Sequence, residues 1–244
     1  MFKQLLKIWS EQAFSQQMIN EFLTMLDDSE KMLSYAFKVL IQESKGKKFD
    51  KKIYQKDKKI NLAEREIRKK VLIHLSTNPT CNLPACLALI SVAKDAERLG
   101  DYVKNIFELR DLLKDPGKSR ALFERLFEKN GTELMELFGM VSTAFENSDR
   151  ELACKAIASG HEIAKRCEDI IEEVASSDYS PRQAVVLALG ARYIKRIAVH
   201  LTNIVTSVTN PLPELDFVGD KPVENSLKSN CEVIEIEEKE KNNI

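Results

Sequence analysis

Glu97 and Asp101 are the residues of this 244-residue chain whose types and spacing most directly suggest chemistry. Because each residue of an α-helix turns through about 100°, the two carboxylates lie about 40° apart on one helical face. Two like charges at this spacing disfavour the helix by a few tenths of a kcal/mol, and a bound cation would reverse that effect. Carboxylate oxygens suit Mg²⁺, Mn²⁺, iron and zinc, but a neighbouring helix would have to complete the coordination.

Asp57 and Asn61 have the same spacing and could supply the missing ligands from a second helix. An amide oxygen can ligate a metal, although it contributes no charge. The alternative is a solvated acidic face whose carboxylates are balanced by nearby cations, namely Lys94, Arg98 and Lys104. The residues alone leave both interpretations open.

Long helices must position these side chains, because glycine and proline are sparse and cluster at a few places. The 8 glycines and 7 prolines leave long uninterrupted stretches between the breaks. The breaks lie at Gly46, Pro79 to Pro84, Pro116-Gly117, Asn147 to Asp149, Ser176 to Pro181, and Pro211 onward. Apolar residues recur at steps of three and four between them, which predicts six helices of roughly 25 to 35 residues in an all-α fold of bundled helices.

An internal repeat is the strongest signal in the chain. Residues 93–106 align with residues 191–204, and alanine, arginine, asparagine and isoleucine coincide in the two segments. Pro84 and Pro181 open the two helices in step. A duplicated three-helix unit explains this agreement, so we expect two tandem antiparallel three-helix bundles related by internal duplication.

The domain organisation follows from the repeat. We expect a first bundle with a short N-terminal extension in residues 1–115, a second bundle in residues 116–210, and an acidic flexible tail in residues 211–244. Residues 45–70 carry twelve Lys and Arg against four acids. Nucleic acid could bind such a stretch through its phosphates, but no reading motif follows it, so a solvated lysine-rich helix is the favoured interpretation.

The segment Glu97-Arg98-Leu99-Gly100-Asp101-Tyr102, followed by Asn105-Ile106, resembles the signature of the PhoU family. The resemblance covers about residues 10–208 and implies two duplicated three-helix bundles, each with a Glu/Asp-x-x-x-Asp motif. It also implies a cytoplasmic, non-enzymatic regulator of phosphate transport and signalling that binds metal ions and acts through protein contacts. The implied partners are a phosphate transporter ATPase and a phosphate-sensing histidine kinase. A homodimer is compatible with this reading, nucleic acid is not expected, and membrane contact would come only through partners.

The resemblance also assigns candidate ligands in the first repeat. Glu97 and Asp101 match the third-helix motif of the family, Asp57 matches its second-helix partner, and Asn61 stands in place of the second acid. We therefore expect a divalent or trivalent ion of iron, zinc, manganese or magnesium in the first bundle only, as one site or cluster.

The second repeat departs from the family pattern. Lys195 and Val199 stand where the third-helix acids belong, and His161 and Lys165 replace the acids of the second helix. Ammonium groups cannot ligate a metal. If His161, Lys165 and Lys195 converge, they would form a cationic patch suited to an anion such as phosphate. Neighbouring acids could neutralise that patch instead through ordinary salt bridges between helices.

Two other functions stay open at this point. One is an accessory subunit of a different phosphate permease, either sodium-coupled or low-affinity. The other is a metal-dependent hydrolase or oxidase that uses Glu97 and Asp101. Catalysis is not expected, because the sequence has no Gly-rich phosphate loop and no nucleophile elbow, and none of its three histidines has a glutamate three residues earlier.

Overall fold

The computed structural model describes residues 13–42, 47–77, 83–113 and 116–216, which form six long α-helices without a strand. The helices are α2 (Ala13–Gln42), α3 (Lys47–Thr77), α4 (Leu83–Glu108), α5 (Pro116–Asn147), α6 (Arg150–Ala175) and α7 (Pro181–Thr209). Two short 3-10 helices follow α4 and α7, η1 (Leu109–Leu112) and η2 (Leu212–Glu214). The predicted all-α fold of six helices is confirmed.

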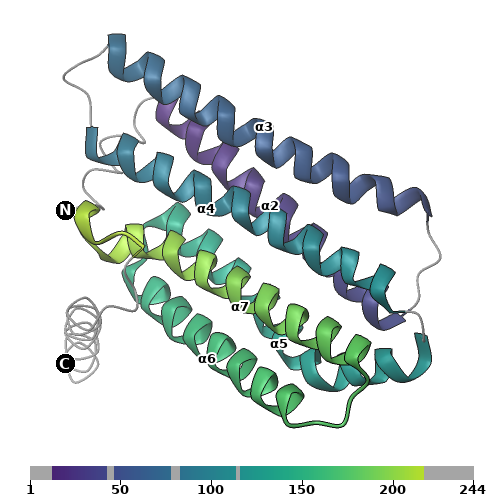
Figure 1. The fold of residues 1–244 in the computed structure, drawn as a ribbon. Helices are drawn as coiled ribbons and strands as arrows, with labels where there is room; N and C mark the ends of the chain where they lie inside the picture. Colours follow the sequence, from purple (N-terminus) through teal and green to yellow (C-terminus); the bar gives the residue numbers. More distant parts are fainter. Residues whose placement is uncertain (1–12, 43–46, 78–82, 114–115, 217–244) are drawn as a thin grey trace, which may run out of the picture.

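The helices form two three-helix units that pack side by side (Figure 1). One unit contains α2, α3 and α4, and the other contains α5, α6 and α7. The units meet where α4 packs on α7 and where α2 packs on α5, so α3 and α6 are the outermost helices (Figure 1). Each unit thus repeats the same antiparallel arrangement, as the internal duplication predicts.

Local capping explains where the helices of the second unit begin. The Asp149 side chain accepts a hydrogen bond from the Leu152 backbone N–H at 3.0 Å and so caps the first turn of α6. At the start of α7, Ser180 and Gln183 form a reciprocal capping box, and Pro181 occupies the first helical position. The predicted breaks at these two places therefore coincide with true helix starts.

Phenylalanines join the two units where α2 packs on α5. Phe22 packs against Phe145 in a tilted arrangement with ring centroids 4.5 Å apart, and the partly buried Phe37 lies 6.2 Å from Phe123. Aromatic pairs at these distances add to the free energy gained by burying their apolar surface. This side of the junction is therefore an apolar core shared by both repeats.

Polar and aromatic groups join the units where α4 packs on α7. The Nδ1 atom of His200 lies 2.7 Å from a carboxylate oxygen of the fully buried Asp95. Tyr102 stacks on the His200 ring at 5.5 Å and lies 6.2 Å from Tyr193. At the shift that aligns the repeats, Asp95 corresponds to Tyr193 and Tyr102 corresponds to His200, so the junction has approximate two-fold symmetry.

The chain just after α7 packs on the first unit. Leu215 is buried, and the Asp216 carboxylate lies 3.3 Å from the Ser91 hydroxyl and 3.7 Å from the Lys94 ammonium of α4. The segment 211–216 thus differs from the flexible tail expected from Pro211 onward, because the buried Leu215 and the partly buried Asp216 anchor it. Residues 217–244 lie outside the described residues. No described helix is both long enough and apolar enough to cross a bilayer.

Candidate metal centre between α3 and α4

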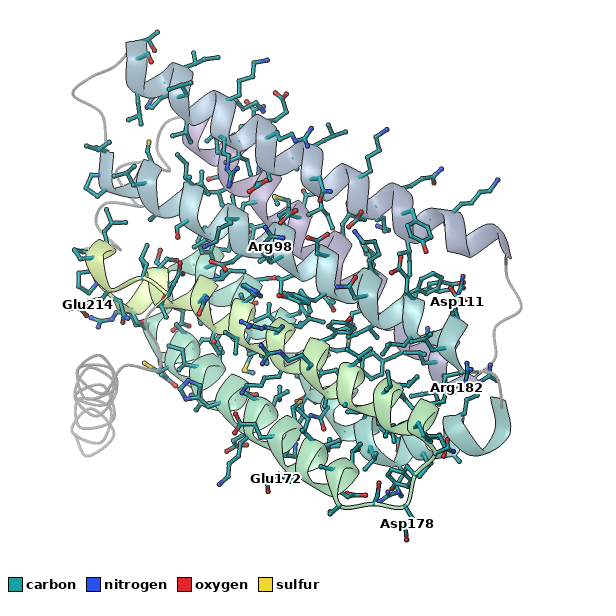
Figure 2. All side chains as sticks on the ribbon, in the orientation of Figure 1. Arg98, Asp111, Glu172, Asp178, Arg182 and Glu214 are labelled. Carbon is teal, nitrogen blue, oxygen red and sulfur yellow. The ribbon has the colours of Figure 1, made fainter. Side chains whose placement is uncertain are left out.

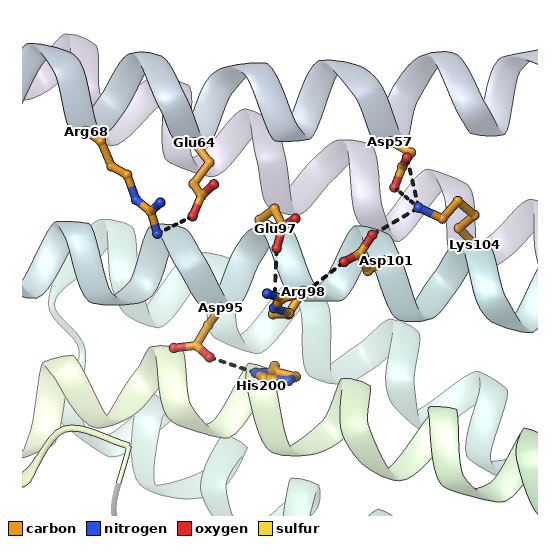
Figure 3. A network of polar contacts seen from close by, with 9 residues as sticks. All are labelled: Asp57, Glu64, Arg68, Asp95, Glu97, Arg98, Asp101, Lys104 and His200. Carbon is orange, nitrogen blue, oxygen red and sulfur yellow. Dashed lines mark hydrogen bonds and ion pairs between the residues drawn. The ribbon is translucent and has the colours of Figure 1, made fainter.

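Three of the predicted ligands, Asp57, Glu97 and Asp101, lie on facing stripes of two antiparallel helices (Figure 3). Asp57 and Asn61 belong to α3, and Glu97 and Asp101 belong to α4. The helices come close together between these pairs, since a Cβ atom placed on Gly100 would lie only 3.1 Å from Ile60 Cδ1. The lack of a side chain at Gly100 therefore helps to bring the two sets of oxygens together.

A lysine ammonium lies between two of the predicted ligands. Lys104 Nζ is 3.0 Å from both oxygens of Asp57 and 3.0 Å from Asp101 Oδ1 (Figure 3). Burial works against the charged form of Lys104, but the hydrogen bonds and negative charges of the two aspartates raise its pKa above the ordinary value. Lys104 is thus a cation built into the site.

Two more carboxylates share this interface. Glu97 Oε2 lies 3.6 Å from Arg98 Nε, and Arg98 Nη1 also contacts Asp101 at 3.1 Å. Glu64 on α3 is largely buried and binds Arg68 at 2.6 Å. Burial raises the pKa of Glu97, and the charges of Asp101, Glu64 and Asp57 raise it further, although Arg98 opposes them. Glu97 therefore lacks the positive charge that would fully stabilise its ionised form.

Asn61, one turn after Asp57 on α3, carries a buried polar atom of interest. Its Oδ1 atom is buried and has no hydrogen-bond partner within the described parts of the chain. A buried carbonyl oxygen without a partner costs about 1–3 kcal/mol, so the fold leaves an acceptor where a cation could satisfy it. The amide oxygen of Asn61 and the carboxylates of Asp57, Glu97 and Asp101 are the hard oxygen ligands that Mg²⁺ and Mn²⁺ prefer.

The side chains do not form a ready coordination shell as they stand. Within residues 13–216, apart from the short gaps, no group of three or more His, Cys, Asp and Glu side chains is arranged to hold a metal ion. Lys104 and Arg98 already occupy oxygens of Asp57 and Asp101. A metal held by both aspartates would therefore have to displace the Lys104 ammonium.

The equivalent interface of the second repeat is neutralised differently. Lys195 on α7 donates a hydrogen bond to Glu168 on α6, and this contact lowers the pKa of Glu168. His161 and Lys165 lie on exposed positions of α6. The interhelical salt bridge considered as the alternative therefore exists, and a cationic patch would have to form with Lys195 already paired.

Comparison with known proteins identifies the family. The model of the PhoU domain matches residues 22–109 and 128–208, one stretch in each three-helix unit. The chain belongs to the PhoU family. The fold is similar to the crystal structure of the phosphate transport system regulatory protein PhoU from Streptococcus pneumoniae, with a TM-score of 0.70 and 19% identity over 80% of this chain and 92% of that one. PhoU from Pseudomonas aeruginosa gives a TM-score of 0.70 and 18% identity over 80% of this chain and 95% of that one. No curated protein gives a significant match.

The interface between α3 and α4 also contains an acid, Glu64, that is not part of the PhoU family's paired-acid motif. Glu64 lies seven residues after Asp57, two helical turns along the same face, and it faces the α4 stripe that carries Glu97 (Figure 3). In the PhoU repeat alignment, Glu64 corresponds to Glu168 and Glu97 corresponds to Lys195. The second repeat thus forms an ion pair at the place where the first repeat gathers two acids. This equivalence was the signal that could have revealed Glu64 before the structure.

Proposed function

We propose that this chain is a metal-dependent, non-enzymatic regulator of phosphate transport that works in the cytoplasm through contacts with other proteins. Its membership of the PhoU family and the likeness to the phosphate transport system regulatory protein of S. pneumoniae support the regulatory role. The proposed partners are a phosphate transporter ATPase and a phosphate-sensing histidine kinase.

One observation carries the metal part of the proposal. Carboxylate oxygens of Asp57, Glu97 and Asp101 face one another from two helices (Figure 3), and one turn after Asp57 the buried Asn61 Oδ1 has no partner in the described structure. Asp57 and Asn61 would hold the ion from α3, and Glu97 and Asp101 would hold it from α4. A bound divalent cation would link the two helices and add positive charge beside Glu97, whose ionised form is disfavoured without it.

Metal analysis of the purified protein tests this assignment. We expect metal in the wild type and little in the double variant Glu97→Ala with Asp101→Ala, while far-UV circular dichroism shows nearly unchanged helicity. A matched control is Lys195→Ala with Val199→Ala, which changes the equivalent positions of the second repeat. The metal site is refuted if the first variant keeps its metal or if the control loses as much.

Affinity capture from phosphate-replete and phosphate-starved cells tests the partners. We expect the wild type to retain a transporter ATPase or a histidine kinase, and the metal-free double variant to retain less of either. Capture of a single sodium-coupled permease alone would instead favour the accessory-subunit alternative. Metal-dependent turnover that Asp101→Ala abolishes would contradict the non-enzymatic assignment.

A further inference from the structure

The outermost helix of the first unit carries a basic and apolar ridge. Lys58, Leu62, Arg65, Lys69 and Leu72 follow steps of four and three along α3, so they line one face, and all five are exposed. Leu62 is 49% exposed and Leu72 is 67% exposed. Nitrogen-tipped side chains project from the outer edge of α3, away from the rest of the fold (Figure 2).

The cations of this α3 ridge have no acidic partner on the described surface. Lys56 and Lys59 neutralise Asp28 on the inner side of the helix. By contrast, Lys58, Arg65 and Lys69 form no ion pair with any residue of the described chain. Glu66 is the one exposed acid between residues 51 and 77; it lies at the edge of the ridge, four residues after Leu62, so the three cations still outnumber it. Because the ridge combines exposed leucines with unpaired cations, the segment that best complements it carries both acidic and apolar side chains.

The chain itself contains a segment of that chemistry. Residues 232–240 read Glu-Val-Ile-Glu-Ile-Glu-Glu-Lys-Glu, with five acids, one lysine and three branched apolar residues. This composition complements the α3 ridge in both charge and apolar content. Charge complementarity of this kind steers two surfaces together, and burial of the apolar side chains then adds affinity.

The described chain ends at a point from which this segment can reach α3. Residue 216 follows η2, which lies at the same end of the molecule as the C-terminal end of α3 (Figure 1). The fifteen residues between 216 and 232 can span about 50 Å when extended, whereas the 31-residue helix α3 is only about 46 Å long. Tethering also gives the segment an effective concentration on the order of millimolar, so even a weak contact would be populated.

We propose that residues 232–240 dock on the α3 ridge of the same chain and cover Leu62 and Leu72. The glutamates pair with Lys58, Arg65 and Lys69, and the valine and isoleucines cover the leucines. The docked segment then competes with any acidic partner for this face of the first unit. This inference concerns a surface separate from the metal centre, so it does not depend on metal binding.

Zero-length crosslinking of the full-length protein tests the docking. A carbodiimide joins lysine amines to carboxylates only where they touch, and peptide mass spectrometry then identifies each pair. We expect residues 232–240 to crosslink to Lys58 and Lys69 far more than to Lys165, an exposed lysine on α6. An equal mixture of unlabelled and nitrogen-15-labelled protein should give these links within one chain. Molar salt should reduce them, because it screens exposed charges.

Two variants keep every crosslinking group and remove the recognition. Leu62→Gln with Leu72→Gln changes the ridge, and Ile234→Gln with Ile236→Gln changes the segment. We expect each pair to lower the crosslink yield about tenfold, since burial of even one such side chain is worth roughly that factor. Val185→Gln, at an exposed apolar position of α7, is the control and should leave the yield unchanged.

The proposal is overturned if the ridge lysines gain no more crosslinks to residues 232–240 than Lys165 does. Links that join light to heavy chains would overturn it in favour of a second copy as the occupant. An unchanged yield in both glutamine variants would show that the apolar contacts play no part, which also contradicts the docking.

Discussion

At the scale of single residues, Lys104 is the side chain with which a metal ion at the proposed site of the first repeat would have to compete. Its ammonium touches both Asp57 and Asp101, and burial between α3 and α4 strengthens these charge-assisted hydrogen bonds. Any cation that uses both aspartates has to displace this ammonium first. The affinity of the proposed site for a metal ion would therefore depend on the competition between that ion and the Lys104 ammonium.

Replacing Lys104 should make metal binding tighter. In Lys104→Gln the competing charge is gone, and we expect the dissociation constant for Mn²⁺ to fall about tenfold, which corresponds to about 1.4 kcal/mol. Isothermal titration calorimetry of metal-stripped protein measures this change. Lys94→Gln is the control, because Lys94 lies near Asp216 and contacts none of the four proposed ligands. Unchanged or weaker binding in Lys104→Gln would show that Lys104 does not occupy the metal position.

Asp28 makes a residue-scale contribution to stability that depends on pH. Burial would raise its pKa, but hydrogen bonds and charges from Lys56 and Lys59 outweigh burial and hold the pKa below its ordinary value. Lys59 Nζ lies 2.8 Å from Asp28 Oδ2. A lowered pKa means that the ionised acid stabilises the fold above its unfolded pKa of about 3.9, and that this stability is lost as the pH falls through the folded pKa.

Asp28→Asn should therefore lower the free energy of unfolding by about 1–2 kcal/mol at pH 7. The difference from the wild type should stay constant between about pH 5 and pH 8 and shrink below about pH 4. Urea unfolding at a series of pH values measures it. Asp27→Asn, which removes only an exposed ion pair with Lys31, should change stability by less than about 0.5 kcal/mol. A difference that persists below pH 3 would rule out the charge as its cause.

At the scale of helices, the second unit depends on one close approach between α6 and α7. A Cβ atom on Gly160 would lie 2.2 Å from Thr202 Cγ2, and Thr202 is buried and β-branched, so it cannot easily move aside. We expect Gly160→Ala to destabilise the fold by about 1–3 kcal/mol through overpacking, despite the better helix propensity of alanine.

Gly139 offers the matched control for this prediction. It lies on α5, and no neighbouring atom of the described structure would come within 4 Å of a Cβ atom there, so Gly139→Ala should stabilise the protein by up to about 1 kcal/mol. Thermal unfolding should therefore move the two variants in opposite directions from the wild type. A higher melting temperature for Gly160→Ala would show that α6 and α7 can separate without cost.

The helices themselves were predictable from the sequence, whereas the contacts that individual side chains make were only partly predictable. The prolines mark helix ends, because proline lacks the backbone N–H that the interior of a helix requires, whereas Gly100, Gly139 and Gly160 lie inside helices. Arg98 and Lys104 were expected to balance the carboxylates and do so, but Lys94 turns toward Asp216 instead. The packing of Leu215 was not predictable, because it follows Pro211 and Pro213 in a segment too short to show helical or strand periodicity. Such contacts depend on the tertiary arrangement rather than on local pattern.

At the scale of the whole molecule, the junction of the repeats differs on its two sides. Phenylalanines fill the side between α2 and α5, where burial alone gives stability. Asp95 and His200 meet on the side between α4 and α7, where a fully buried carboxylate needs a partner. Burial of Asp216 and the negative charge of Asp95 raise the pKa of Asp216, so a second negative charge beside Asp95 is unfavourable.

The Asp95–His200 pair should therefore couple the two units energetically. His200→Ala leaves the buried carboxylate of Asp95 without this donor, and we expect a loss of about 2–4 kcal/mol in the free energy of unfolding. Asp95→Asn alone should also destabilise, but the double variant should lose less than the sum of the two, with a coupling energy of about 1–3 kcal/mol. His161→Ala, at an exposed position of α6, is the control and should cost less than about 0.5 kcal/mol.

The shape of the urea unfolding transition tests whether the Asp95–His200 pair joins the two units into one cooperative structure. If the pair helps to join the units into one cooperative structure, the wild type unfolds in a single steep transition, whereas the units of His200→Ala begin to unfold separately. The apparent slope with urea should then fall, because each step exposes less surface than the whole fold. Additive losses with an unchanged slope would mean that the phenylalanine side alone holds the repeats together.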